Sequence, residues 1–188
     1  MQILLASASP RRKEILSRII GNNFIAKGFD VDENYFAETP EETTIELAKR
    51  KLKAVNDPQL YDVIITSDTI VWENGVYYGK PSNLEEAKQM LLDLSDKTHK
   101  VISSILVKYK DKIEIDTSVS LVKIKNLGLK DIENYIKNFY VLDKAGSYAI
   151  QDGVIVEKYT GSYDNIVGLP SEKLIEIFKK LNLSNIIK

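Results

Sequence analysis

The chain has 188 residues and a formal net charge of −1, with 26 Lys and Arg against 27 Asp and Glu. A chain of this length can bury a substantial core, and we expect one domain over residues 1–188. It has no Cys and one His, which excludes disulfides, thiolate zinc sites and cysteine nucleophiles; a Ser-His-Asp triad would have to use His99. The balanced charge gives no general attraction to nucleic acid or to anionic membranes.

No apolar run approaches the ~20 residues that a membrane-spanning helix needs. The apolar stretch at residues 3–6 is too short for the core of a signal peptide, and its positive charges follow it instead of preceding it. The sequence therefore predicts a cytoplasmic protein with no membrane partner.

The first predicted elements are a strand and a helix. Residues 2–6 form a short apolar run typical of a buried strand. A helix is expected over residues 11–20, with Ser9 as its N-cap and Pro10 at its first position, where a missing N–H costs nothing. Gly21 is expected to end this helix.

The next stretch predicts a strand over residues 24–31 and a helix that begins at Thr39-Pro40 and ends near residue 58. The β-branched run at residues 63–66 is typical of a strand buried on both faces. Asn74-Gly75 is a strong turn signal for a hairpin whose strands are residues 70–72 and 76–78.

Strands and helices continue to alternate to the end of the chain, which predicts the α/β class. No linker, repeat or low-complexity segment interrupts them. The expected elements are a helix capped by Ser82 or Asn83, strands over 99–108 and 112–125, a helix over 129–138, a strand over 154–159 and a last helix that opens after Gly168.

Ser7, Ser9, Arg11 and Arg12 surround the start of the first helix. Two arginines at the positive end of a helix dipole are locally unfavourable, by a few tenths of a kcal/mol for each charge. A bound anion would reverse that sign, and helix N–H groups, hydroxyls and guanidinium groups together suit a phosphate. The alternative is two exposed arginines behind a helix cap, and this segment alone favours neither.

Acidic residues follow two predicted strands. Asp68 lies within or just after the apolar run, where open α/β sheets place catalytic groups, although a turn Asp is the simpler interpretation. Asp32 and Glu33 follow the second predicted strand and offer oxygen ligands to a hard divalent cation, or are simply solvated.

Other polar residues are less specific. Lys51, Lys80 and Lys144 each lie near the end of an element and are individually typical of surface lysines. Gln151 lies in a glycine-rich region and offers a donor and an acceptor for a base edge. His99 has no ligand partner at a suitable spacing and is assigned a structural or surface role. No basic-aromatic stripe indicates a nucleic-acid partner.

Several short motifs occur in a fixed order along nearly the whole chain. They are Leu5-Ala6-Ser7-Ala8-Ser9-Pro10-Arg11-Arg12, Val31-Asp32-Glu33, Leu47-Ala48 through Lys51 to Ala54, Ser67-Asp68-Thr69-Ile70-Val71, Gly79-Lys80-Pro81, Asp143-Lys144-Ala145-Gly146-Ser147-Tyr148-Ala149-Ile150-Gln151 and Asn165-Ile166-Val167-Gly168-Leu169-Pro170. Together they resemble the Maf family of nucleoside triphosphate pyrophosphatases. The ordered set is far more specific than any one motif.

The resemblance implies an α/β fold with an elongated mixed central sheet flanked by helices, two lobes around an active-site cleft, and a chain that frequently forms a homodimer. It implies that Asp68 is the general base and that Glu33 and Asp68 bind a divalent cation, Mg²⁺, Mn²⁺ or Co²⁺. With the serines of the helix start, the phosphate-binding set becomes Ser7, Ser9, Arg11, Arg12, Lys51, Lys80 and Lys144.

The expected reaction is hydrolysis of a nucleoside triphosphate to a monophosphate and pyrophosphate. The resemblance is to the branch that prefers dTTP and UTP, with CTP and modified pyrimidine nucleotides as further substrates, and it places substrate discrimination at Arg11, Thr69 and Gln151. A sister branch acting on 7-methyl-GTP typically has Gln where this chain has Thr69, and the family usually has Ala where it has Ser67. Two alternatives stay open: a pyrophosphatase for 7-methyl-GTP or another non-standard purine, and a septum-formation regulator acting through a partner surface.

Overall fold

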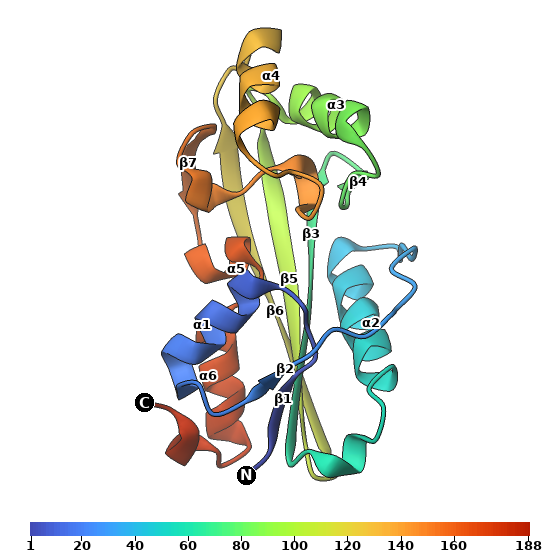
Figure 1. Ribbon diagram of the computed structural model, residues 1–188, viewed down its shortest axis with the longest axis vertical. Helices are drawn as coiled ribbons and strands as arrows, with labels where there is room; N and C mark the ends of the chain where they lie inside the picture. The colour runs from blue at the N-terminus through green and yellow to red at the C-terminus, as the bar shows by residue number, and fades with distance from the viewer. The chain divides into compact units, whose positions relative to one another are not determined.

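The computed structural model describes all residues from 1 to 188 and confirms the predicted α/β class. Seven strands form one mixed sheet in the order β2-β1-β3-β5-β6-β7, with β4 paired to β3 (Figure 1). The strands are β1 (Ile3–Leu5), β2 (Ile25–Ala26), β3 (Val63–Glu73), β4 (Val76–Tyr78), β5 (Thr98–Tyr109), β6 (Lys112–Ile124) and β7 (Val156–Thr160). The helices are α1 (Pro10–Ile20), α2 (Pro40–Lys53), α3 (Leu84–Leu94), α4 (Leu129–Asn138), α5 (Tyr163–Val167) and α6 (Ser171–Lys180). No helix is both long enough and apolar enough to cross a bilayer.

The chain forms two compact units. Unit 1 comprises Met1–Asp68, Ser103–Ser118 and Ser162–Lys188, and unit 2 comprises Thr69–Ile102 and Val119–Gly161. Because β3, β5 and β6 each contribute residues to both, the units are not separated by linkers. The expectation that residues 1–188 act as one domain stays a prediction.

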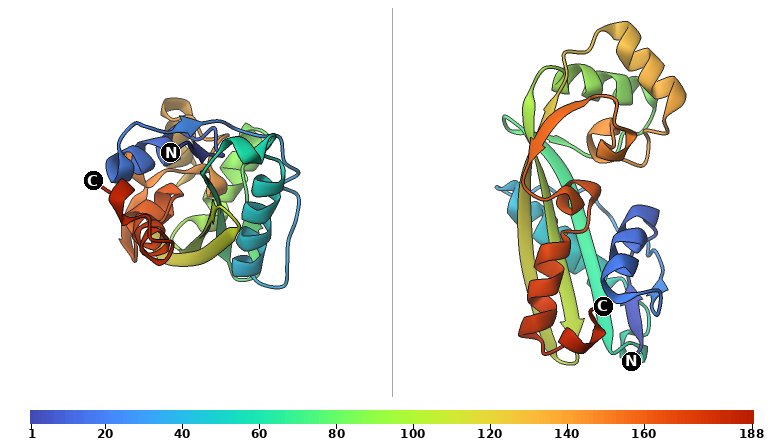
Figure 2. Two further views of the ribbon diagram at one scale, coloured as in Figure 1. Left: turned by 90° about the horizontal axis from the view of Figure 1, so that it is seen from below. Right: turned by 90° about the vertical axis from the view of Figure 1, so that its left-hand side faces the viewer.

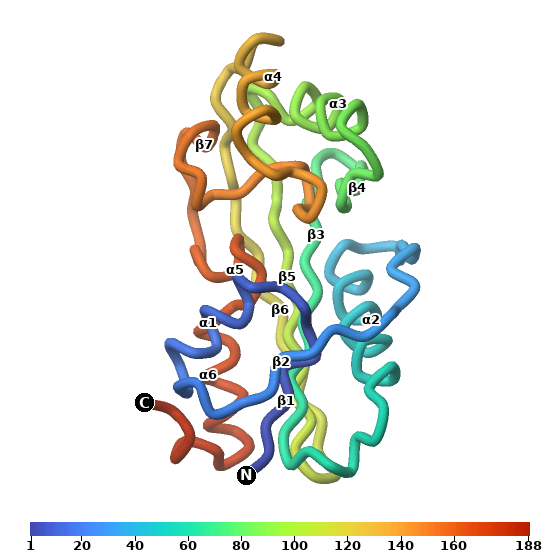
Figure 3. The backbone as a smooth tube through the Cα atoms, viewed as in Figure 1, coloured from blue at the N-terminus to red at the C-terminus, as the bar shows by residue number.

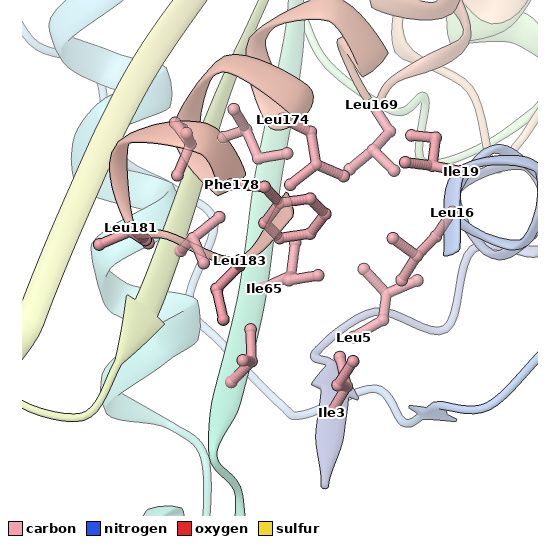
Figure 4. Packing of buried hydrophobic residues seen from close by; sticks show 14 of the residues in the cluster. Ile3, Leu5, Leu16, Ile19, Ile65, Leu169, Leu174, Phe178, Leu181 and Leu183 are labelled. Carbon is pink, nitrogen blue, oxygen red and sulfur yellow. The ribbon is translucent and has the colours of Figure 1, made fainter. Parts of the chain in front are cut away.

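Unit 1 is built around the parallel strands β1, β2 and β3, in which Leu4 pairs with Ile25 and with Ile64. Successive side chains of a strand point to opposite faces, so these apolar runs need cover on both sides. Ile3, Leu5, Val63 and Ile65 pack with residues of α1 and α6, including Leu16 and Phe178 (Figure 4). Leu4, Ala6 and Ile64 pack with Val55 and with Leu52 of α2. Both ends of the chain lie in this unit (Figure 2), where the Lys188 N–H donates to the Ile19 carbonyl at 2.9 Å.

In unit 2, β4 pairs with β3 and β7 pairs with β6, both antiparallel. The turn between β3 and β4 is the predicted Asn74-Gly75, and both residues have positive φ, 46° and 87°. That is the backbone a two-residue hairpin turn requires. Helix α3 buries Ala87, Met90, Leu91 and Leu94, and helix α4 buries Ile132 and Tyr135. The predicted bounds of α4 are confirmed.

The helix starts were well predicted because they depend on local chemistry. The Ser9 hydroxyl accepts the Arg12 N–H, and Pro10 occupies the first turn. Thr39 and Glu42 form a capping box at the start of α2, and Asn83, not Ser82, caps α3.

The structure differs from the predicted elements at three places. The strand expected over residues 24–31 is limited to β2, because after Ala26 only the Lys27 N–H still bonds to β1, at the Leu5 carbonyl. The two expected strands around Asp68 are one continuous strand, β3, so Asp68 lies within the strand, which is one of its two expected positions. The short helix α5, capped by Ser162, was missed.

Candidate active site

Helix α1 begins with the serines and arginines that the sequence analysis singled out. The Ser7 Oγ accepts the Ser9 N–H at 3.2 Å, and the Ser9 Oγ accepts the Arg12 N–H at 3.4 Å. The first turn contains no acidic residue, and its two cations, Arg11 and Arg12, are both half-buried. A positive helix end carrying two further positive charges is a site suited to an anion.

Arg12 is held from the opposite end of the sequence. Its Nε donates to the Gly168 carbonyl at 2.8 Å, and the Ser67 Oγ donates to the same oxygen at 3.1 Å. Burial lowers the pKa of Arg12, although the negative charges of Asp68 and Glu33 oppose this effect. A guanidinium stays protonated in proteins, so Arg12 is a fixed, partly desolvated positive charge beside two carboxylates.

Those two carboxylates meet at one lysine. The Lys51 Nζ lies 2.5 Å from the Asp68 Oδ1 and 2.9 Å from the Glu33 Oε1. The side chains of Asp68 and Lys51 are only 7% and 12% exposed, whereas that of Glu33 is 40% exposed. Unit 1 thus gathers two cations and two anions from α1, α2, β3 and the loop between β2 and α2.

The periods of helix and strand explain why Lys51 reaches Asp68. Helix α2 contacts β3 at Thr66, whose hydroxyl donates to the Ala48 carbonyl at 2.8 Å. Asp68 is two residues farther along the strand and so points to the same face as Thr66. Lys51 is three residues beyond Ala48 and lies on the same side of the helix. The contact of Thr66 with Ala48 therefore brings Lys51 close to Asp68, a relation that the sequence alone did not reveal.

Glu33 and Asp68 fit the role of ligands to a hard divalent cation because both offer carboxylate oxygens at one place. No group of three or more His, Asp or Glu residues in the structure could hold a metal ion by itself. Two carboxylates suit Mg²⁺ or a similar ion that completes its coordination with substrate phosphates and water.

In unit 2, the segments that carry Lys80 and Lys144 are joined by the backbone. The Gly146 N–H donates to the Gly79 carbonyl at 3.1 Å, so the two lysines lie on neighbouring stretches of chain. Lys80 is exposed, and Lys144 is half-buried and lies 2.8 Å from the Asp143 Oδ1. Gly146 has φ of 68°, and an added Cβ would lie 3.2 Å from Val71 and 3.3 Å from Leu94, so this tight turn requires glycine.

Gln151 and Thr69 also belong to unit 2, where Thr69 is half-buried on β3 and Gln151 is exposed in the short 3-10 helix η3 (Ile150–Asp152). The turn that carries Gln151 is held by Tyr135 of α4. The Tyr135 hydroxyl accepts the Ala149 N–H at 3.1 Å and donates to the Asp152 carboxylate, so it binds the turn on both sides of Gln151. Sequence reasoning missed Tyr135, although its spacing from Ile132 is that of a buried helix face.

His99 is structural, in agreement with one of its two expected roles. It is 2% exposed, and its Nε2 lies 2.7 Å from the hydroxyl of buried Tyr148. Burial lowers the pKa of His99 to about 4 and raises the pKa values of Tyr148 and Tyr135 above their ordinary range. All three side chains are therefore neutral at pH 7.

The fold and the site together define a class of protein, a mixed α/β fold with a charged site at the start of its first helix. The structure of the Staphylococcus aureus Ham1 protein shares this fold, with a TM-score of 0.51 and 20% sequence identity over 97% of this chain and all of that one. The likeness in fold agrees with the mixed sheet flanked by helices.

The chain belongs to the Maf-like protein family, whose model matches residues 2–181. It is 44% identical to the dTTP/UTP pyrophosphatase of Clostridium tetani, over 98% of this chain and all of that protein. It is 42% identical to the dTTP/UTP pyrophosphatase of Pyrococcus furiosus, over the whole of this chain and 97% of that protein. The resemblance read from the ordered motifs is therefore confirmed.

Proposed function

We propose that this protein hydrolyses nucleoside triphosphates to a nucleoside monophosphate and pyrophosphate, with dTTP and UTP as preferred substrates. The observation that carries the proposal is the contact of Lys51 with both Asp68 and Glu33, beside the buried charge of Arg12. The name of the relatives, dTTP/UTP pyrophosphatase, supports both the proposed reaction and the proposed nucleotide bases.

The phosphate chain would be bound by the cations of the site. A triphosphate carries about four negative charges, which needs a matched group of positive side chains. The proposed set is Arg11, Arg12, Lys51, Lys80 and Lys144, with Ser7 and Ser9 at the positive end of α1. In-line attack moves charge onto the oxygen that leaves with pyrophosphate, and fixed cations stabilise that charge without having to reorganise.

Asp68 is the proposed general base. Its Oδ1 is held by the Lys51 ammonium, which leaves Oδ2 to accept a proton from the attacking water. The water oxygen forms a bond to the α phosphorus, its proton passes to Asp68, and the bond from the α phosphorus to the bridging oxygen breaks. Pyrophosphate then leaves with the electron pair of that bond.

A divalent cation, Mg²⁺, Mn²⁺ or Co²⁺, is the proposed cofactor, held by Glu33 and Asp68. When bound, such an ion lowers the pKa of water and offsets phosphate charge. The chain's own part is to hold the two carboxylates together, which the Lys51 ammonium does by contacting both.

Discrimination between bases is proposed for Arg11, Thr69 and Gln151. The exposed amide of Gln151 has both a donor and an acceptor, which suits the edge of a pyrimidine base. Thr69, in place of the Gln typical of the branch that acts on 7-methyl-GTP, is the reason for proposing pyrimidine nucleotides. We further propose that the protein is cytoplasmic. We also propose that it forms a homodimer, and light scattering coupled to size-exclusion chromatography tests this oligomeric state.

The decisive experiment is a panel of triphosphates, dTTP, UTP, CTP, 7-methyl-GTP and ITP, each with Mg²⁺, Mn²⁺ or Co²⁺. We expect equal amounts of monophosphate and pyrophosphate, with the highest kcat/KM for dTTP and UTP. In ¹⁸O-enriched water, attack on the α phosphorus places the label in the monophosphate, whereas attack on the β phosphorus places it in pyrophosphate. Release of orthophosphate with a diphosphate product, or no turnover of any triphosphate, would overturn the proposal.

A further inference from the structure

Glu33 lies on the long loop between β2 and α2, residues 27–39, which is easily followed in Figure 3. The loop folds on itself around this residue, because the Asp32 Oδ1 accepts the Asn34 N–H and the Glu33 carbonyl accepts the Tyr35 N–H, both at 2.9 Å. These local bonds shape the turn but do not tie it to the rest of unit 1. The contact of Glu33 with Lys51 therefore needs a separate anchor.

Arg50 supplies such an anchor from helix α2. Its guanidinium lies over the Tyr35 ring, 4.4 Å from the centroid, and its Nη1 donates to the Asp32 carbonyl at 3.3 Å. Its Nε lies 3.5 Å from Glu46 one turn earlier on the helix, which fixes the direction of the side chain. Arg50 thus contacts the loop on both sides of Glu33, at Asp32 and at Tyr35.

The C-terminal end of the loop is anchored independently. The Thr43 hydroxyl, on the buried face of α2, accepts the Ala37 N–H at 2.9 Å. Loss of Arg50 would therefore loosen residues 32–35 without detaching the loop from the helix.

We propose that Arg50 is a positioning residue, which holds the turn at residues 32–35 on α2 so that Glu33 stays in contact with Lys51. Arg50 and Lys51 are neighbours on the helix and point about 100° apart, so Arg50 grips the loop backbone while Lys51 joins the Glu33 carboxylate to Asp68. The inference rests on the proposed function, since it assigns Arg50 an effect on the reaction through Glu33.

A double-mutant cycle tests whether Arg50 acts through Glu33. We expect Arg50→Ala to lower kcat/KM for dTTP about 10-fold in the native background and less than about 2-fold in a Glu33→Gln background, because residues coupled through a shared backbone segment are not additive. Lys49→Ala, which removes the same charge from an exposed neighbouring position, should leave kcat/KM unchanged. An equal loss from Arg50→Ala in both backgrounds would overturn the inference while leaving the proposed function intact. Failure of the proposed function would appear instead as no turnover by the native protein.

Variants of the Tyr35 ring and of the Arg50 guanidinium distinguish a positioning role of Arg50 from a general effect on protein stability. Tyr35→Phe keeps the ring face and should retain activity, whereas Tyr35→Ala should match Arg50→Ala. Arg50→Lys keeps a charge above the ring but lacks the planar fork, so it should recover only part of the loss.

Amide hydrogen exchange gives a readout that does not depend on activity. In Arg50→Ala, exchange at Asn34 and Tyr35 should become faster while Ala37, held by Thr43, stays as protected as in the native protein. Unchanged exchange at Asn34 and Tyr35 would show that Arg50 does not hold the turn.

Discussion

Unit 1 places ionised side chains against its interior, where Arg12, Lys51 and Asp68 are half-buried or buried, whereas unit 2 fills a similar environment with the neutral His99, Tyr135 and Tyr148. The charged group in unit 1 contains two cations and two carboxylates that contact one another or lie close by. In unit 2 the uncharged imidazole of His99 contacts the Tyr148 hydroxyl, and the Tyr135 hydroxyl contacts the Ala149 N–H and the Asp152 carboxylate.

If the proposed function is right, the charged side chains of unit 1 serve a ligand, whereas the neutral side chains of unit 2 serve the fold. Charges held away from water cost free energy, and replacing them with apolar groups is often neutral or stabilising. Buried hydrogen bonds between neutral groups instead help to fix one arrangement of the chain. We therefore expect changes to the charged side chains of unit 1 to lower activity with little loss of stability. Changes to the neutral side chains of unit 2 should lower stability with little loss of activity.

The largest effect is expected from Asp68→Asn, which should lower kcat about 1,000-fold because the amide cannot accept the proton of water. The thermal unfolding midpoint should change little, since Lys51 keeps its contact with Glu33. Steady-state kinetics with dTTP and thermal unfolding followed by circular dichroism check both points. Asp57→Asn, at an exposed position of unit 1, is the matched control. Near-normal kcat in Asp68→Asn would remove this residue from the mechanism.

The next effect concerns the start of α1, which is proposed to bind phosphate. Arg12→Ala should lower kcat/KM about 100-fold through loss of a fixed guanidinium. Arg12→Lys should recover little of this loss, because an ammonium cannot bond to the Gly168 carbonyl and at the same time bind a phosphate through two N–H groups. Arg18→Ala, on the same helix but exposed and paired with Asp164, should behave like the native protein. Equal losses in Arg12→Ala and Arg18→Ala would mean that the charge of the helix matters, and not the position of Arg12.

In unit 2, Tyr135→Phe should lower the free energy of unfolding by about 1–3 kcal/mol, because the buried Ala149 N–H and the Asp152 carboxylate lose their partner. Urea unfolding followed by the fluorescence of Trp72, the one Trp of the chain, reports on this unit. The folded variant should keep most of its kcat and change its preference between dTTP and CTP, since the turn carries Gln151. Loss of kcat without loss of stability would break the contrast between the units.

The smallest effect is a pH dependence from His99. Its folded pKa of about 4 is below the unfolded value of about 6.5, so the unfolded chain binds the proton first. The full contribution to stability is present above pH 6.5 and is lost as the pH falls toward 4. The loss should reach about 1 kcal/mol at pH 5.5. His99→Gln should remove this part of the pH dependence of unfolding, and an unchanged profile would show that His99 is accessible to protons in the folded state.

The elements predicted correctly are those that short stretches of sequence determine. Ser9-Pro10 specifies a helix start and Asn74-Gly75 a hairpin turn, whatever surrounds them. The strand expected over residues 24–31 was wrong because its extent depends on the length of its partner, β1. The residue composition of the site stays a prediction, which rests on residues that lie in ordered motifs.

The contacts within the site were not readable, because they join residues far apart in sequence. Nothing near Lys51 indicates that its ammonium bridges Glu33 and Asp68. The bond from Arg12 to the Gly168 carbonyl and the grip of Arg50 on Tyr35 likewise depend on how α2, α6 and the strands pack. Such contacts follow from packing and not from local propensity.

The order in which the two units occur along the chain has a consequence for synthesis. Every residue of unit 2 precedes Ser162, whereas unit 1 still needs its last segment, Ser162–Lys188. That segment brings Leu174 and Phe178 to the main apolar cluster and the Gly168 carbonyl to Arg12. Unit 1 therefore stays incomplete until this last segment has been made, and we expect the proposed activity to require it.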